Sequence, residues 1–314
     1  MNRKKLALIG TGVTVGTFLL ITSAYAGIAE NSGYETYKAA IKNTVTAKSM
    51  TDTVAVSVQD NGKQVLNVNA TVKKDKTAKA VSANVNVQGG GTDQSVNVYT
   101  TADGKKVIKT SASDIYNVFD AKDNQHGREN KKEKTDELQG DKFNKEAENL
   151  IDALVGNLKQ YVTETAAANG GKEIHISLSG SQLPTAVNAV GSFLVKKASH
   201  DSLNARESDA SSKKELFGAD LSGLKQAMPK LTQDVAITNV DIQASVDGNN
   251  TITKQKAALT ISGKDESGAA HTVIVNADLG ITGLDATTPD SIDLTGKQVQ
   301  TVDAKQWDKS KFNH

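Results

Sequence analysis

The sequence predicts an α+β fold, in which a curved antiparallel sheet made of two meanders wraps over three or four amphipathic helices. In two stretches, residues 54–108 and 240–281, apolar residues alternate with polar ones, as in strands with one dry and one wet face. Elsewhere apolar residues recur every three or four positions, as in helices. A sheet with one apolar face must bury it, and helices that lie between the meanders in sequence are the simplest cover.

An export signal or membrane anchor is predicted at the amino terminus, residues 1–26. Basic residues at positions 3–5 precede an apolar run at 6–21, which has the length of a signal-peptide core. The triplet Ala24-Tyr25-Ala26 follows the small-x-small rule and places cleavage near Ala26, before Gly27. Cleavage would yield a secreted protein.

The alternative is an uncleaved anchor formed by residues 6–29, which carry no charge. About 20 apolar residues are enough to span a bilayer. Under either interpretation the basic start stays inside, so residues 30–314 lie outside the cytoplasmic membrane. The chain has no cysteine, which excludes a lipidated cysteine, disulfides and cysteine zinc sites and fits bacterial export.

A first helix is predicted over residues 34–48, with Ser32 as its cap. One apolar stripe defines it, formed by Tyr34, Tyr37, Ile41 and Val45. The period then changes to two, which predicts a meander. Its turns are expected at Asp60-Asn61-Gly62, at Gly89-Gly90-Gly91 and at Asp103-Gly104.

The middle of the chain mixes polar loops and helical stripes. Residues 120–142 and 198–212 are polar and are expected to be solvated loops. A long helix is predicted over 143–162, ended by Asn169-Gly170-Gly171, and a short strand over 174–178. Two further helices are expected, one capped by Ser181 over 183–194 and a short one from a Ser212/Glu215 capping box to Leu224.

Strands return over residues 240–246, 257–261 and 273–281, and a polar carboxy-terminal tail occupies 285–314. Residues 31–284 are expected to form a single α+β domain; two lobes divided near 120–142 are the alternative. The two meanders begin with a similar layout of strand, Gly/Asn turn, strand and charged turn. This layout is equally compatible with an ancient duplication and with two independent meanders.

The order of helix, meander, long helices and closing meander behind an export signal resembles the lipoprotein-carrier half-barrels of the LolA and LppX type. The phrase GYETYKAAIKNT, followed by strands, is also similar to uncharacterised exported proteins of Bacillus-type bacteria. The resemblance covers most of residues 33–281 and contains no diagnostic motif. It implies a hydrophobic groove between sheet and helices that holds an acyl chain.

Charge and motifs argue against several functions. Basic and acidic residues number 37 and 36, which gives no reason to expect a nucleic-acid partner. The histidines show no metal-ligand spacing, so no metal or cofactor is expected; they are His126, His175, His200, His271 and His314. Asp120, Asp123 and Asn124 lack the spacing of a calcium loop, and residues 177–181 lack a nucleophile elbow. The lone Trp307 is expected to pack the tail onto the domain, and contact with a partner is the alternative.

The sequence therefore predicts an exported, non-enzymatic protein of the bacterial cell envelope that binds a lipid or other apolar ligand. The alternative is a structural or interaction protein of the envelope with a filled core, whose partner is another envelope protein. A ligand groove would be lined by strand residues facing one helix, namely Leu66, Val68, Val85, Val273 and Val275 against Leu154 and Leu158. The same residues also describe an ordinary core.

Overall fold

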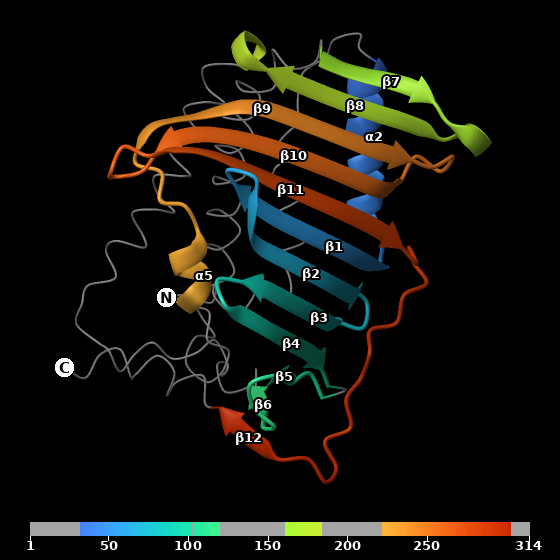
Figure 1. Cartoon of the computed structure of the whole chain (residues 1–314). Coiled ribbons are helices and arrows are strands. Elements are labelled where there is room, and N and C mark those ends of the chain that lie inside the picture. The colour runs from blue at the N-terminus through green and yellow to red at the C-terminus, as the bar shows by residue number, and fades with distance from the viewer. Residues whose placement is uncertain (1–31, 102, 120–160, 184–221, 303–314) are drawn as a thin grey trace, which may run out of the picture.

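The computed structural model describes residues 32–101, 103–119, 161–183 and 222–302. Within these ranges twelve strands form one sheet, in the order β12-β6-β5-β4-β3-β2-β1-β11-β10-β9-β8-β7 (Figure 1). The strands are β1 (Ser49–Asp60), β2 (Lys63–Asp75), β3 (Ala80–Gly89), β4 (Thr92–Thr100), β5 (Lys106–Thr110), β6 (Tyr116–Phe119), β7 (Val162–Ala166), β8 (Lys172–Ser179), β9 (Gln233–Val246), β10 (Ile252–Lys264), β11 (Ala270–Thr282) and β12 (Val299–Val302).

The two meanders meet edge to edge at β1 and β11. These strands pair antiparallel from Thr51 opposite Thr282 to Asp60 opposite Val273. Every described pairing is antiparallel except that of β12 with β6, which is parallel. The predicted antiparallel sheet is therefore confirmed. Short turns produce it: Asn61 and Gly62 both have positive φ, as a two-residue hairpin requires.

The sheet has an apolar inner face and a polar outer face. On β1, Val54 is buried and lies opposite Ala70 of β2 and Leu279 of β11, which are buried too. Their neighbours point the other way, since side chains alternate along a strand. The inner face is the one covered by helix α2 (Ser32–Thr46), which lies behind the sheet in Figure 1 and contacts β7, β9 and β10.

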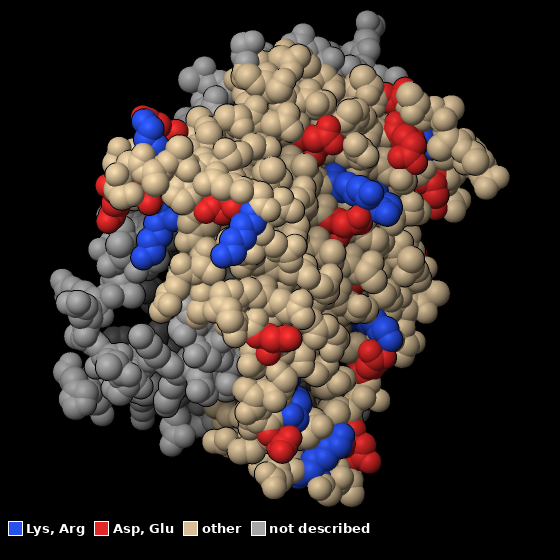
Figure 2. Space-filling model, viewed as in Figure 1, with Lys and Arg blue, Asp and Glu red and all other residues tan. Residues whose placement is uncertain are grey.

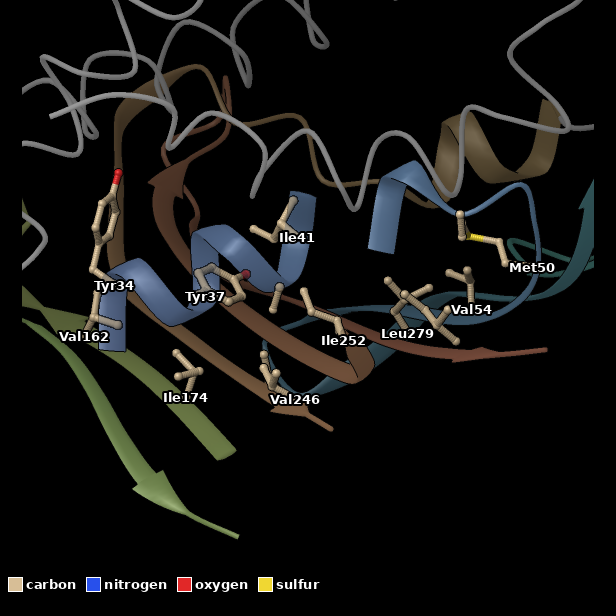
Figure 3. Close-up of a cluster of buried hydrophobic side chains, with 14 of the residues drawn as sticks. Tyr34, Tyr37, Ile41, Met50, Val54, Val162, Ile174, Val246, Ile252 and Leu279 are labelled. Carbon is tan, nitrogen blue, oxygen red and sulfur yellow. The ribbon is translucent and has the colours of Figure 1, made fainter. Parts of the chain in front are cut away.

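Helix α2 is held by an apolar stripe (Figure 3) and by buried polar contacts. Tyr34, Tyr37 and Ile41 are buried against the sheet, as the sequence predicts, whereas Val45 is exposed and does not extend the stripe. The Tyr37 hydroxyl donates to Gln255 Oε1 over 3.1 Å. Thr44 Oγ1 donates to its own helix and accepts the Ile252 N–H over 2.8 Å, which ties α2 to the start of β10. These contacts fix one end of the inner face.

A second, short helix, α5 (Ser222–Ala227), contacts β2 and β3. It approaches the β3–β4 turn so closely that a Cβ on Gly90 would overlap the carbonyl oxygen of Gly223. Gly90 also has a φ of 56°, a conformation that other residues rarely adopt. The predicted break at residues 89–91 is thus confirmed, and glycine is needed there for two separate reasons.

After β11 the chain runs along the ends of several strands and returns to the far edge of the sheet (Figure 1). The Asp285 N–H donates to Ser49 O, and the Thr287 N–H donates to Ser49 Oγ. The Asp290 N–H donates to Ser82 Oγ over 2.8 Å. We call residues 283–298 the strap; it places β12 beside β6.

The predicted α+β fold class is wrong. Within the described ranges the sheet dominates, and α2 is the single long helix that covers it, in place of three or four helices wrapped by a sheet. The physical reason is visible at Val162, where the sequence predicts the end of a helix over 143–162. Val162 begins strand β7 and pairs with Ile176, and residues 169–171 form the β7–β8 turn. A three- and four-residue spacing of apolar residues does not by itself exclude a strand, and Val162 is followed by Thr163 and Thr165, which favour one.

Several expectations fall outside the described residues: the segment 1–26, the loops at 120–142 and 198–212, and nearly all of the helices at 143–162 and 183–194. Asp120, Asp123, Asn124 and Trp307 also lie outside them, as do His126, His200 and His314. Of the helices that are described, none has the length and hydrophobicity needed to cross a membrane.

Candidate functional site

The outer face of the sheet carries polar side chains across most of its strands. Its strands are in register, so side chains line up in rows that cross the sheet. The middle row contains His175, Gln243, Lys256, Asp278, Ala55, Asn69, Asn86 and Ser95. On β1 to β4 the middle row and its two neighbours carry almost entirely amide, hydroxyl and small side chains, and Asp93 at the margin is the one charged residue.

Two adjoining hollows mark the centre of this face. One, of about 450 Å³, spans β9, β10, β11, β1 and β2, and the other, of about 290 Å³, spans β11, β1, β2 and β3. They share Ala55 and Asp278, so we treat them as one depression, the central trough. The outward side chains that line it are Thr53, Ala55, Ser57, Asn67, Asn69, Thr71, Asn84, Asn86, Asp241, Gln243, Lys256, Ala258, Asn276 and Asp278.

The trough exists because small side chains lie between longer ones. Ala55 is flanked in its row by Asp278 and Asn69, and Ala258 is flanked by Asp241 and Asn276. A methyl group between two longer neighbours leaves a depression whose floor is partly backbone. In the sequence, Ala55 and Ala258 are visible only as small residues at solvent-facing positions of their strands. Nothing in the sequence indicates that β10, β11 and β1 are adjacent, which is what brings these alanines close together.

Hydrogen bonds between side chains hold part of the trough in place. Asn84 Nδ2 donates to Asn97 Oδ1 over 2.7 Å, and Asn86 Nδ2 donates to Asn84 Oδ1 over 3.1 Å. Gln243 Nε2 donates to Asp241 Oδ1, whose second oxygen lies 2.7 Å from His175 Nε2. These contacts orient amides at both ends of the trough before any ligand arrives.

Charges around the trough are few and partly compensated, and Figure 2 shows this face with only scattered charged side chains. Asp241 lies beside His175, and Asp278 lies 3.9 Å from the ammonium of Lys254. Lys256 adds one positive charge to the lining. The trough therefore offers hydrogen-bond donors and acceptors with little net charge.

The residues expected to line an apolar groove lie on the inner face. Val85 and Val273 are buried within hydrophobic clusters, and Leu66, Val68 and Val275 are partly buried against such clusters. Leu154 and Leu158 lie outside the described residues. The structure thus places the five strand residues on one face, in packed surroundings. The binding of an apolar ligand there stays a prediction.

His271 forms a second polar cluster, which joins two hairpin turns. Its Nδ1 lies 2.8 Å from Asp60 Oδ2, and its Nε2 lies 3.6 Å from Asp265 Oδ2. The hydrogen bond with Asp60 raises the pKa of His271 above its ordinary value, and Asp265 adds to the effect against the opposing cost of burial. A raised pKa favours the protonated imidazole, which is a poor general base. The cluster fits a clamp between turns better than a catalytic group.

The remaining sequence-predicted positions have ordinary roles. His175 and His271 lie on strands, as expected. Residues 177–181 contain the end of β8 and a short 3₁₀ turn, in which the Ser179 N–H donates to Gln182 Oε1. In the described ranges no cluster of acidic and histidine side chains could hold a metal ion. Sequence reasoning missed the Asp60–His271 pair because 211 positions separate the two residues.

No protein-family model matches this chain, and no curated protein matches it. A solved structure, a beta-barrel-like protein with a domain of unknown function from Brucella abortus, aligns with 74% of this chain and 98% of its own. The identity is 10% and the TM-score 0.17, and a likeness of that size carries no argument about fold or function. The resemblance to lipoprotein carriers therefore stays a prediction.

Proposed function

We propose that this chain is an exported, non-enzymatic binding protein of the bacterial cell envelope that acts through the outer face of its sheet. The observation that supports this best is the central trough, a depression lined by amides and hydroxyls, while the described apolar residues pack together on the inner face. This favours the interaction protein over the lipid carrier. The basic and apolar segment 1–26 supports export.

The binding role is tested by retention on washed envelope fractions of an exporting Gram-positive host. We expect the wild-type protein to sediment with the envelope and the Ala55→Gln variant to remain largely in solution, because the longer side chain fills the trough. Thr165→Gln changes an exposed residue of β7 on the same face, away from the trough, and is the matched control. Equal retention of all three proteins would contradict the proposal.

The lipid-carrier function is distinguished by native mass spectrometry of the protein purified without detergent. Our proposal predicts the mass of the polypeptide alone, before and after incubation with host lipid extract. A reproducible added mass that organic solvent removes and that fragments as a lipid would favour the carrier and count against the outer face as the main site. The same spectrum shows whether the chain begins at Gly27, as signal cleavage predicts.

A further inference from the structure

We infer that the central trough binds an uncharged polysaccharide; this rests on the proposed binding function and names its ligand class. The trough crosses six neighbouring strands, from β9 to β3. With adjacent strands about 4.8 Å apart, it is roughly 24 Å long, enough for several linked sugar units. An elongated, shallow site open along its length suits a polymer better than a small molecule, which proteins usually enclose.

The chemistry of the lining matches sugar hydroxyls. An asparagine or glutamine side chain offers two donors and an acceptor, and a serine or threonine hydroxyl offers both functions. The trough presents such groups on both sides of a floor that contains Ala55 and Ala258. Each vicinal pair of sugar hydroxyls can therefore donate and accept at once, and successive sugar units meet similar groups along the rows.

Other classes of partner fit this face less well. Nucleic acids and anionic membranes need clustered lysine and arginine, whereas the lining has Lys256 against Asp241 and Asp278. Protein interfaces usually have an apolar or aromatic centre, and among the described lining residues none is aromatic. An uncharged, hydroxyl-rich chain is the partner that requires no ionic or apolar anchor.

The same lack of aromatic side chains limits the affinity for one sugar. A hydrogen bond to a sugar hydroxyl replaces hydrogen bonds to water and adds little net affinity, so a monosaccharide should bind weakly. A polymer gains by engaging many subsites at once, because each further contact is made within the same complex. The side-chain pairs Asn84–Asn97 and Asn86–Asn84 reduce the entropy lost on binding.

Affinity electrophoresis of the full exported chain tests this inference. Native gels would contain dextran, laminarin or hydroxyethyl cellulose, three uncharged polymers of different linkage. We expect at least one polymer to retard the wild-type protein at 0.5 M NaCl as strongly as at low salt, because the contacts are not ionic. Ala55→Gln and Asn69→Ala should weaken the retardation at least fivefold, and Thr165→Gln should not change it.

Three outcomes of the electrophoresis would overturn the inference. They are mobility unaffected by every polymer, retardation that salt abolishes, and retardation equal in wild type and Ala55→Gln. The inference would also be overturned if Ala55-dependent retention on the envelope survived removal of the glycans. In that case an envelope protein, and not a glycan, would be holding the chain. That result would leave the proposed binding function standing. Loss of envelope retention altogether would instead contradict the proposed function.

Discussion

At the scale of single residues, two neighbouring lysines of β2 form ion pairs in different surroundings. Lys74 reaches Asp52, whose side chain is completely buried on the inner face, over 2.8 Å. Lys73 points outward and pairs over 2.6 Å with Asp290 of the strap, which is 57% exposed. A buried charge that loses its partner costs far more than a solvated one.

We therefore expect Lys74→Met to lower the free energy of unfolding by about 3 kcal/mol, because it leaves the Asp52 carboxylate unpaired. Lys73→Met, the matched control, should cost less than about 1 kcal/mol. The double variant Asp52→Leu/Lys74→Met should recover most of the loss. Urea unfolding measures all three, and equal costs for the two lysine variants would contradict the prediction.

His271 makes stability depend on pH, with a defined sign. Its pKa is higher in the folded protein than in the unfolded chain, so the folded state holds the proton more tightly. The stabilisation is fully present below the unfolded value, about 6.5, and is lost as pH rises through the folded value. We expect the wild type to lose more free energy of unfolding than His271→Gln between pH 5.5 and pH 9, because only the wild type gives up this bound proton. Parallel pH profiles of unfolding would show that the clamp does not act this way.

At the scale of elements, α5 and the β3–β4 turn touch through two backbones. A side chain on Gly90 would overlap Gly223, whereas one on Gly91 would meet no atom within 4 Å. Both glycines have positive φ, so the backbone cost of replacing them is similar. This makes Gly91→Ala a control that isolates the contact with α5.

Gly90→Ala should destabilise the protein by at least about 1 kcal/mol more than Gly91→Ala, because the turn or α5 must move. In thermal unfolding this corresponds to a further drop in Tm of about 2–4 °C. Equal Tm values for the two variants would contradict this prediction and would mean that α5 can move away from the turn without lowering the stability of the protein.

At the scale of the whole molecule, the strap connects the last long strand to the opposite edge of the sheet. Residues 283–298 contact Ser49 and Ser82, and they place β12 beside β6. Strand β6 has four residues and would otherwise be an open edge. The strap therefore protects the edge that is farthest from α2.

A chain that stops after Leu284 should exchange amide hydrogens much faster in β5 and β6, while β9 and β10 keep their protection. A chain that stops after Val302 retains the strap and β12 and is the control. Hydrogen exchange with mass spectrometry resolves these strands. A uniform increase along the whole sheet would contradict a local role for the strap.

The outer trough and the inner core could be predicted only in part. Alternation placed Asn67, Asn69 and Asn84 on wet faces and Val54 and Leu279 on dry ones, and the structure confirms this. It did not reveal that β1 and β11 are partners, which is what brings Ala55 beside Asp278 and forms the trough. It also suggested a helix through Val162, where pairing with β8 produces a strand.

The sequence by itself determined most strands of the two meanders, their turns and which side of these strands is polar, because alternation, Asn-Gly turns and glycine breaks act over a few residues. Only the tertiary structure decided which strands are neighbours, in particular that β1 pairs with β11, and that Asp60 meets His271. Such contacts join residues more than 200 positions apart. The free energy of such contacts depends on the entropy of closing long loops and on how well two surfaces pack. A local sequence pattern contains no information about either.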